Sequence, residues 1–292
     1  MPMRAIVGYD GSPGSSAAID AGALLFPGAH GWITYLWAPP FASEEVRRRL
    51  RAIAGDVNAL IEMVEQEGER EAQRVVATGV TLARAAGWDA APLLKRTWGG
   101  EGLRIAQAAE EVQADLVLVG SRGLGGTQAV LGSVSDMVAH YCARPVVVVP
   151  YPMLTAEYAA LAGGPVVVGW DGSAGAEAAF AAAKRLFPER DMLLVSVDEG
   201  TTAELPSDLS VAGRGEVVRL TVDRGHGLRA RAVSSALIAT ARDREAAVMV
   251  VGSRGRSAAR EILLGSVAMG TLHHSHRPVM VVPSEWEAPS KP

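Results

Sequence analysis

The chain has little cysteine, no excess of positive charge and no long apolar run, and each absence argues against a class of protein. Its 292 residues include one cysteine, Cys142, so no disulfide can form within the chain and a reducing compartment is favoured. The 32 acidic residues outnumber the 28 basic ones, which argues against a nucleic-acid partner. No apolar stretch approaches the ~18 residues that cross a membrane, and the first residues run into a predicted strand with no room for a signal peptide. We therefore expect a cytoplasmic globular protein without a membrane or nucleic-acid partner.

Several catalytic signatures are also missing. Only Lys95, Lys184 and Lys291 are lysines, and the Gly-Lys-Ser/Thr tripeptide of a Walker P-loop does not occur. The Gly-x-Ser-x-Gly elbow of serine hydrolases does not occur either. The densest histidine group, His273-His274-x-His276, lies late in a predicted helix, where adjacent side chains point in different directions. We interpret it as an exposed helix end rather than a metal site.

Two parts of the chain are near copies of each other. Ala5-Ile-Val-Gly-Tyr-Asp10-Gly-Ser recurs as Val166-Val-Val-Gly-Trp-Asp171-Gly-Ser, and a glycine-rich stretch that begins at Gly120 recurs at Gly252. The length fits two domains of about 145 residues each. We predict a first domain at 1–150, a connection at 151–164, a second domain at 165–283 and a C-terminal tail at 284–292.

Strands and helices alternate along each copy. Short apolar runs that end in Gly or Asp are typical of strands buried on both faces of a parallel sheet, and the Ala-rich stretches that follow the first strands predict helices. The fold class is therefore α/β, with two tandem open parallel sheets and ligands expected beyond the C-terminal ends of the strands. Later strands are predicted at 32–37, 90–95, 116–119 and 146–149 in copy one, and at 192–197, about 228–233, 248–251 and 279–282 in copy two. Later helices are predicted at about 101–112 and 234–243, and from Ser133 and Ser266.

The two copies differ in length. The interval from Asp10 to Gly120 exceeds that from Asp171 to Gly252 by 29 residues, and the excess falls at 44–86. There, apolar residues recur every three or four positions, which predicts an amphipathic helix whose stripe packs on its own domain or covers the partner domain or a second chain. The stripe consists of Val46, Leu50, Ile53, Val57, Leu60 and Val64. Copy two has only about 205–226 in this place, with a short helix considered at 215–222.

Each copy places a glycine-rich loop with hydroxyl side chains between a strand and a helix. Backbone N–H groups at a helix N-terminus, with the helix dipole behind them, favour a phosphate group there. These features resemble the universal stress protein family over essentially the whole chain, as two tandem domains. The family's nucleotide motif is Gly, two residues, Gly, nine residues, Gly, then Ser or Thr. Copy two matches this motif without a gap, at Gly252, Gly255, Gly265 and Ser266. Copy one is one residue short in the long interval, at Gly120, Gly123, Gly132 and Ser133.

The resemblance implies Rossmann-like domains of the adenine-nucleotide alpha-hydrolase type that bind ATP with Mg²⁺. It implies an aspartate after the first strand beside the ribose, and a residue at the end of the second strand beside the adenine. An aspartate in this place also suits a turn or a helix N-cap, and Arg254 either neutralises phosphate charge or points into solvent. The candidate residues are Asp171, Val197, Gly252, Arg254, Gly255, Gly265, Ser266 and Val267 in copy two, and Asp10, Trp37, Gly120, Gly123, Gly132, Ser133 and Val134 in copy one.

The two candidate sites are not equal. Copy one has the shorter loop, and our alignment sets Trp37 against Val197 in the adenine slot. Trp37 either stacks on the base, a gain of roughly 1 kcal/mol beyond its burial, or fills the slot and excludes the nucleotide. We expect a stoichiometry nearer one nucleotide per chain than two, held mainly by copy two.

The function that these features favour is an ATP-binding regulator of the stress response without efficient catalysis. Phosphoryl transfer needs placed positive charge or metal, and the loops offer neither a lysine nor a carboxylate pair. The alternatives are a structural member of the fold that binds no nucleotide and, less favoured, an adenylate-forming enzyme. Beyond the nucleotide, we expect an unidentified protein partner, a possible homodimer, and pairing of the two last strands, which would otherwise be exposed sheet edges.

Overall fold

The computed structural model describes residues 2–38, 44–121, 131–198, 215–221, 229–255 and 264–287. Copy one contains β1 (Arg4–Gly8), α1 (Pro13–Leu25), β2 (His30–Trp37), α2 (Glu44–Arg51), α3 (Val57–Ala85), β3 (Asp89–Arg96), α4 (Glu101–Glu111), β4 (Leu116–Gly120), α5 (Ser133–Tyr141) and β5 (Val146–Val149). The connecting helix is α6 (Thr155–Gly163). Copy two contains β6 (Val166–Gly169), α7 (Ala174–Leu186), β7 (Met192–Asp198), β8 (Gly215–Thr221), α8 (Arg229–Asp243), β9 (Val248–Gly252), α9 (Ser266–His274) and β10 (Val279–Val282).

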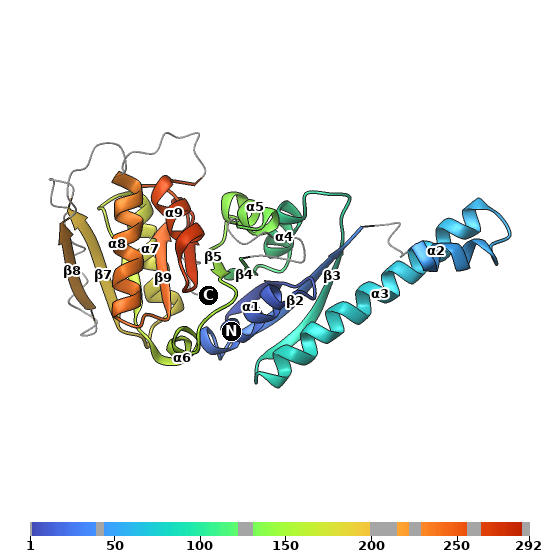
Figure 1. The fold of residues 1–292 in the computed structure, drawn as a ribbon, viewed down its shortest axis with the longest axis horizontal. Coiled ribbons are helices and arrows are strands. Elements are labelled where there is room, and N and C mark those ends of the chain that lie inside the picture. The colour runs from blue at the N-terminus through green and yellow to red at the C-terminus, as the bar shows by residue number, and fades with distance from the viewer. Residues whose placement is uncertain are drawn as a thin grey trace.

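The strands of both copies form one continuous ten-stranded sheet in the order β3-β2-β1-β4-β5-β10-β9-β6-β7-β8 (Figure 1). Neighbours within each copy are parallel, and β5 and β10 join the copies as an antiparallel pair, with Val148 opposite Val279. The predicted α/β class with parallel sheets is confirmed, and so is the predicted pairing of the last strands. All four residues of β5 and of β10 are buried, so this pairing covers two apolar edges at once.

Helices cover both faces of the sheet, and each face has a core that continues across the two copies. Buried side chains of α1, α3 and α7 belong to one core, and those of α4, α5, α8 and α9 belong to the other. On the first face, Phe26 and Phe187 stand in corresponding places just after α1 and α7, and their ring centroids are 5.0 Å apart. The duplicated sequence therefore packs against itself about an approximate twofold axis.

Arginines of copy two fix the two halves to each other. Arg190 Nη2 donates to the carbonyl of Leu24 at 3.2 Å and to that of Leu161, in α6, at 2.6 Å. Arg185 Nη2 lies 3.3 Å from Asp115 Oδ1 of copy one. Because these contacts join α1, the connecting helix and copy two, the interface combines an apolar centre with specific polar contacts.

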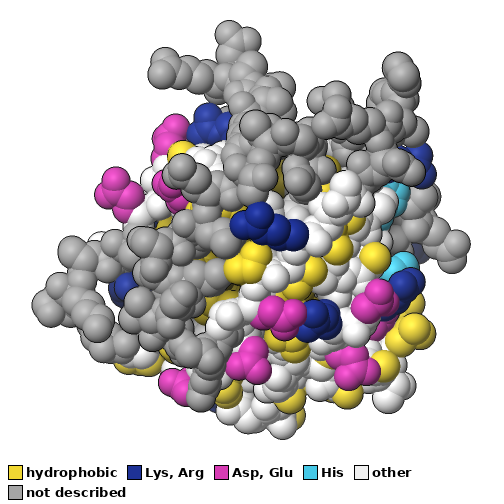
Figure 2. All heavy atoms as spheres, turned by 90° about the vertical axis from the view of Figure 1, so that its left-hand side faces the viewer, with side chains coloured by type: hydrophobic (Ala, Val, Ile, Leu, Met, Phe, Trp, Pro, Cys, Tyr) yellow, Lys and Arg dark blue, Asp and Glu magenta, His cyan; other side chains and the backbone are white. Residues whose placement is uncertain are grey.

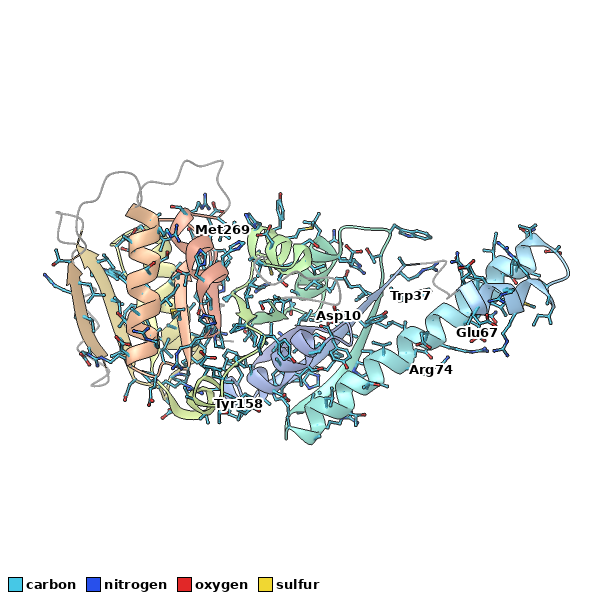
Figure 3. All side chains as sticks on the ribbon, viewed as in Figure 1. Asp10, Trp37, Glu67, Arg74, Tyr158 and Met269 are labelled. Carbon is cyan, nitrogen blue, oxygen red and sulfur yellow. The ribbon has the colours of Figure 1, made fainter. Side chains whose placement is uncertain are left out.

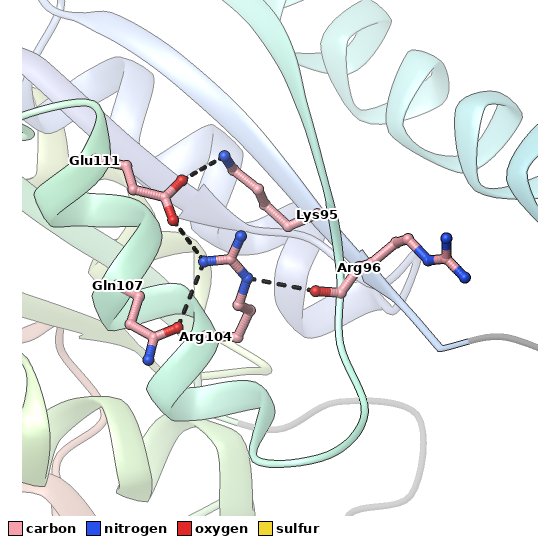
Figure 4. Close-up of polar contacts among 5 residues, drawn as sticks. All are labelled: Lys95, Arg96, Arg104, Gln107 and Glu111. Atoms are coloured by element: carbon pink, nitrogen blue, oxygen red, sulfur yellow. Dashed lines mark hydrogen bonds and ion pairs between the residues drawn. The ribbon is translucent and has the colours of Figure 1, made fainter.

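The two outer strands carry the features that keep sheet edges from pairing with other chains. The β3 edge contains Pro92, which has no N–H to offer, and its Lys95 Nζ lies 2.5 Å from Glu111 Oε2. Figure 4 shows this pair together with Arg104, whose Nη1 lies 2.6 Å from Glu111 Oε1 and whose Nε donates to the Arg96 carbonyl at 3.3 Å. The hydrogen bonds from Arg104 and Lys95 lower the pKa of Glu111.

The opposite edge is β8. There Arg244, which follows α8, makes a two-point ion pair with Glu216, with N–O distances of 2.6 and 2.9 Å. Figure 2 faces this side of the molecule and shows acidic and basic side chains interspersed with apolar ones. Charged side chains along a half-exposed strand disfavour edge-to-edge association.

The additional segment of copy one forms a hairpin of two helices rather than the single predicted helix. The helix is interrupted at 52–56 although the apolar spacing continues through Ile53, and Asp56 caps α3 by accepting from the backbone N–H of Ala59 at 2.8 Å. From Val64 onward, α3 buries a stripe on copy one, which includes Val64, Ala72, Val76 and Val80. The other end of the hairpin extends away from the sheet (Figure 1). Of the predicted stripe, only Val64 is buried, whereas Ile53 and Val57 are exposed. The prediction that this stripe packs on its own domain is therefore wrong for most of its residues, and the side chains that pack on copy one lie later in α3.

The third strand of copy two lies elsewhere than predicted. Residues 229–233, expected as a strand, form the first turns of α8, and 215–221, considered as a short helix, form β8. The stretch from Gly215 to Thr221 pairs with β7 over its whole length and half-buries Val217, Val218 and Leu220. Its β-branched residues suit a strand, whereas the alanines and arginines of 229–233 suit a helix.

The structure also bears on the single cysteine and on the expected lack of a membrane span. The Cys142 side chain is buried, and burial raises its thiol pKa to about 11, so the thiol stays protonated near neutral pH. Among the helices that the structure describes, none has the length and apolarity required to cross a bilayer.

Candidate functional site

Each copy begins with the same turn after its first strand. In copy two, Asp171 Oδ1 accepts from the backbone N–H of Ser173 at 3.0 Å, and Ser173 then caps α7. In copy one, Asp10 Oδ1 accepts from Ser12 at the same distance, and Ser12 caps α1. The glycines between them have φ of +81° in copy one and +73° in copy two, a region that glycine enters without strain. The turn role considered for both aspartates is therefore real, and it occupies one oxygen of each carboxylate.

The structure brings the first and fourth strands of copy two together at this turn. A Cβ built on Gly255 would lie 2.9 Å from Asp171 Oδ2, so the aspartate and the second glycine of the motif are in contact. Gly252 has a packing role in the structure. A Cβ built there would lie 2.5 Å from the carbonyl carbon of Gly175 in the first turn of α7. Gly252 is thus required by strand–helix packing, and Gly120 meets Gly14 of α1 in the same way.

The base of each glycine loop is closed by backbone hydrogen bonds. In copy two, the N–H of Gly265 donates to the Ser253 carbonyl at 2.6 Å, and Ser253 Oγ accepts from the N–H of Ser284 at 3.2 Å. Copy one repeats the closure, with Gly132 donating to Ser121 at 2.8 Å. The tips of the loops, 122–130 with Gly123 and 256–263, lie outside the described residues.

The helices after the loops begin without a side-chain cap. The N-caps of α5 and α9 are Gly132 and Gly265, whereas Ser12, Asp56 and Ser173 cap α1, α3 and α7 with their side chains. The first N–H groups of a helix have no partner within it, so α5 and α9 point uncapped donors toward the loop bases. Ser133 and Ser266, the first residues of these helices, are exposed. Val134 and Val267, which follow them, are half-buried against the core and anchor each helix start.

Arg254 neither points freely into solvent nor is reserved for a ligand. Its Nη2 lies 3.1 Å from the carboxylate of Glu285, just beyond β10. Glu285 is itself highly exposed, so the pair stays in contact with water and holds Arg254 only weakly. The guanidinium remains at the base of the loop, where an added anion would compete with Glu285.

The surroundings of the aspartate in copy one differ because α3 passes beside it. Gly79 of α3 packs on Tyr9 and Ile33, where a Cβ would lie within 2.9 Å of both side chains. Burial, together with the charge of Asp10, raises the pKa of Tyr35 in this region. Figure 3 shows that Trp37 lies nearer the hairpin than Asp10 does.

The alignment of Trp37 with Val197 is wrong by one residue. The first strands pair with the second so that Gly8 faces Thr34 and Gly169 faces Val195. This register makes Leu36 the counterpart of Val197, so Trp37 and Val197 project to opposite faces of the sheet. The Trp37 side chain is 5% exposed and lies under the guanidinium of Arg96, whose Cζ is 5.2 Å from the ring centroid. Trp37 is therefore a packed residue of the β2–β3 edge.

Comparison with known proteins decides the family. The sequence model of the universal stress protein family matches this chain twice, at residues 1–150 and 164–283. The chain belongs to the universal stress protein family. It is a tandem member, with two domains of that family in one polypeptide.

Relatives of this family agree with the assignment. A universal stress protein of Mycolicibacterium smegmatis is 31% identical over 188 residues, which is 58% of this chain and 62% of that protein. Universal stress protein PHOS34 of Arabidopsis thaliana is 45% identical over 53 residues, 17% of this chain and 20% of that protein. The chain thus spans about three-fifths of the length of the first relative and one-fifth of the second.

Solved structures share the fold over nearly the whole chain. A universal stress protein from Archaeoglobus fulgidus DSM 4304 matches with a TM-score of 0.68 at 19% identity, over 96% of this chain and 98% of that one. A protein of unknown function from Pseudomonas aeruginosa PAO1 matches with a TM-score of 0.57 at 12% identity, over 97% and 92%. At such identities the likeness establishes the fold.

Sequence reasoning missed the residues that shape the base of the loop. Ser253, Ser284 and Gly175 contact the candidate residues directly but belong to no recognised part of the motif. The duplication could have indicated two of these residues. Ser253 repeats Ser121 after the first loop glycine, and Gly175 repeats Gly14 at the start of the first helix. Among the described residues, no group of three or more His, Cys, Asp or Glu side chains is placed to hold a metal ion.

Proposed function

We propose that this universal stress protein is a cytoplasmic regulator that binds ATP with Mg²⁺, mainly in copy two, and does not turn it over efficiently. The observation that carries the proposal is the start of α9, where an exposed Ser266 and an uncapped, glycine-started helix face the same loop base as Asp171. A helix start of this kind favours phosphate. The contact between Gly255 and Asp171 places a carboxylate beside that phosphate region.

The residues at this loop base can pair with both the phosphate and the ribose groups of a nucleotide. The N–H groups at the start of α9 and the Ser266 hydroxyl would bind phosphate oxygens, and the carboxylate of Asp171 would accept from ribose hydroxyls. Mg²⁺ usually keeps several waters and binds through phosphates, so the phosphates of the nucleotide and water would supply most of its ligands. Neither loop carries a lysine, which supports binding without efficient phosphoryl transfer.

The proposal predicts which nucleotide leaves the denatured protein. We expect the purified chain, once denatured, to release intact ATP at nearer one equivalent per chain than two. Copy one has the shorter loop, and α3 crowds the turn at Asp10, so its site is the weaker one. Chromatography of the released nucleotide measures both identity and amount. No nucleotide, together with no ATP uptake by calorimetry, would favour the purely structural alternative, and AMP as the product would favour an adenylate-forming enzyme.

We also propose that the hairpin pairs two copies of the chain. Three apolar side chains near its free end remain exposed, at 70% for Ile53, 71% for Val57 and 49% for Ile61. The two helices carry opposite charge, since α2 is rich in arginine and the first half of α3 is rich in glutamate. Two hairpins laid antiparallel would bury these apolar side chains and set each arginine-rich helix against the partner's glutamates.

This arrangement predicts a dimer that depends on the hairpin. Replacing Ile53 and Val57 by Glu should convert the dimer to a monomer in sedimentation experiments, because two charges would enter the apolar contact. The matched control is Leu82→Glu, an exposed apolar position on the same helix but beside the body of copy one. A monomeric unmodified chain, or a dimer that survives the double change, would show that the hairpin has another role.

A further inference from the structure

A cavity of about 270 Å³ lies in copy two, well away from the glycine loop. Its lining includes Met249 near the beginning of β9, whereas the loop follows Gly252 at the end of the same strand. The other walls come from the second half of α8, from residues 274–277 at the end of α9 and just after it, and from Glu157 of the connecting helix α6. The cavity therefore opens at the opposite edge of the sheet from the proposed nucleotide.

Copy one has an ion pair at the corresponding place. There Arg144 makes a two-point ion pair with Glu110, with Nε–Oε1 at 3.0 Å and Nη2–Oε2 at 2.9 Å. Arg277 is the counterpart of Arg144, since each precedes the proline before a last strand. The counterpart of Glu110 is Arg242, since each stands ten residues before the first glycine of a loop. Copy two has thus exchanged the carboxylate of this pair for a second guanidinium.

Two further polar differences bring histidine to the cavity of copy two. Tyr141 and Ala143 of copy one correspond to His274 and His276, and both histidines line the cavity of copy two. An imidazole can donate a hydrogen bond in either neutral tautomer and carries positive charge when protonated. The exchange of Ala143 for His276 adds a donor to the cavity, and the exchange of Tyr141 for His274 keeps one donor and adds a group that can carry positive charge.

Arg277 is the part of this cluster that is unusual for a protein interior. It is 7% exposed, and its Nη1 donates to the Ala246 carbonyl at 2.6 Å. Among the described residues, no carboxylate oxygen lies within ion-pair distance of it, in contrast to Arg144. Burial lowers its pKa, and the more distant charges of Glu157 and Glu245 oppose this shift. A buried guanidinium is stabilised by an anionic partner.

The remaining charges at the cavity leave room for one such partner. Arg242, at the exposed rim, has its Nε 2.9 Å from Oδ1 of Asp243, and both side chains are highly exposed, so this ion pair is weak. The one carboxylate in the lining, Glu157, accepts from the backbone N–H of Leu154 at 2.6 Å and is held at the start of α6. Ile238, Ala239 and Met249 supply an apolar wall.

We propose that this cavity binds a small organic carboxylate with an apolar body, whose carboxylate takes the place that Glu110 occupies in copy one. Arg277 and Arg242 bind the carboxylate, because a planar guanidinium offers paired donors to its two oxygens. The apolar body lies against Ile238 and Met249. The volume is just below the ~300 Å³ lower range of drug-sized pockets, which indicates an acid of about one ring.

Benzoate and benzamide test the proposal, since they share shape and differ in charge. We expect calorimetry on the full chain to show one benzoate site, with benzamide at least tenfold weaker. Arg242→Glu should weaken benzoate at least tenfold and raise the melting temperature, because it restores the pair found between Glu110 and Arg144. Arg277→Met should also weaken benzoate, and the matched change in copy one, Arg144→Met, should not.

Other outcomes overturn the proposal in distinct ways. Equal affinity for benzamide would show that charge is not recognised, and unchanged affinity in Arg242→Glu would show that benzoate lies elsewhere. Inorganic phosphate that binds as tightly as benzoate would assign the cluster to a simple anion. Gly255→Val should leave benzoate binding intact, so the two proposed sites fail or stand separately.

Discussion

Gly255→Val is expected to lower the ATP affinity of the chain by about 30- to 150-fold, which corresponds to about 2–3 kcal/mol. A Cβ at this position would lie 2.9 Å from Asp171 Oδ2, closer than a side chain tolerates, so the carboxylate must leave its place. The added methyl groups would also occupy the space at the base of the loop. Gly255 is exposed, so the fold should persist, and calorimetry with ATP and Mg²⁺ measures the loss.

Two further variants separate the causes of this loss. Asp171→Asn keeps an oxygen that can accept from Ser173 but removes the charge, and should weaken ATP by about tenfold, in the range of one charge-assisted hydrogen bond. Gly28→Val is the control, because a Cβ there meets no atom within 4 Å. Unchanged ATP affinity in both Gly255→Val and Asp171→Asn would remove the copy-two site from this position.

Gly252→Ala is expected to destabilise the fold by about 3 kcal/mol, at the upper end of the cost of overpacking. The new methyl group would lie 2.5 Å from the carbonyl carbon of Gly175 and closer still to its oxygen, and both of these are backbone atoms. Neither β9 nor α7 can yield by rotating a side chain, so strand and helix must separate. Urea denaturation should show a lower midpoint with an unchanged slope.

The duplication supplies an internal repeat of this test. Gly120→Ala should have an effect of similar size, because its Cβ would meet the backbone of Gly14 at 2.5 Å. Gly28→Ala should change stability by less than about 0.5 kcal/mol, as is usual for a surface change without contacts. If Gly252→Ala were as mild as Gly28→Ala, the close packing of β9 on α7 would not be a rigid feature of the protein.

Predictions that rest on local signals agree with the structure. The Asp-Gly-Ser turns, the helices that follow them and the apolar first strands are all found where the sequence indicates them, with Ser12 and Ser173 rather than the aspartates as the N-caps. The duplication itself predicts two like halves, and the apolar last strands predict their pairing. In each case the deciding interactions lie within a few residues or follow from an apolar run too regular to be left exposed.

The errors share a different cause. Whether 215–221 becomes a strand depends on β7 being available to pair with it, and the short local pattern is ambiguous. The placement of Trp37 against Val197 depends on strand register, where a shift of one residue moves a side chain to the other face. The break in the hairpin falls where the apolar spacing alone continues smoothly.

The sequence by itself therefore determined the family, the α/β class, the order of most elements and the motif residues of the candidate site. Only the tertiary structure decided what those residues touch. Gly255 meets Asp171, Gly252 meets Gly175, and Arg277 has no carboxylate of the described residues in the place where Arg144 has Glu110. Local patterns are set by neighbours along the chain, whereas these contacts form when the sheet brings distant segments together, and no spacing in the sequence encodes that approach.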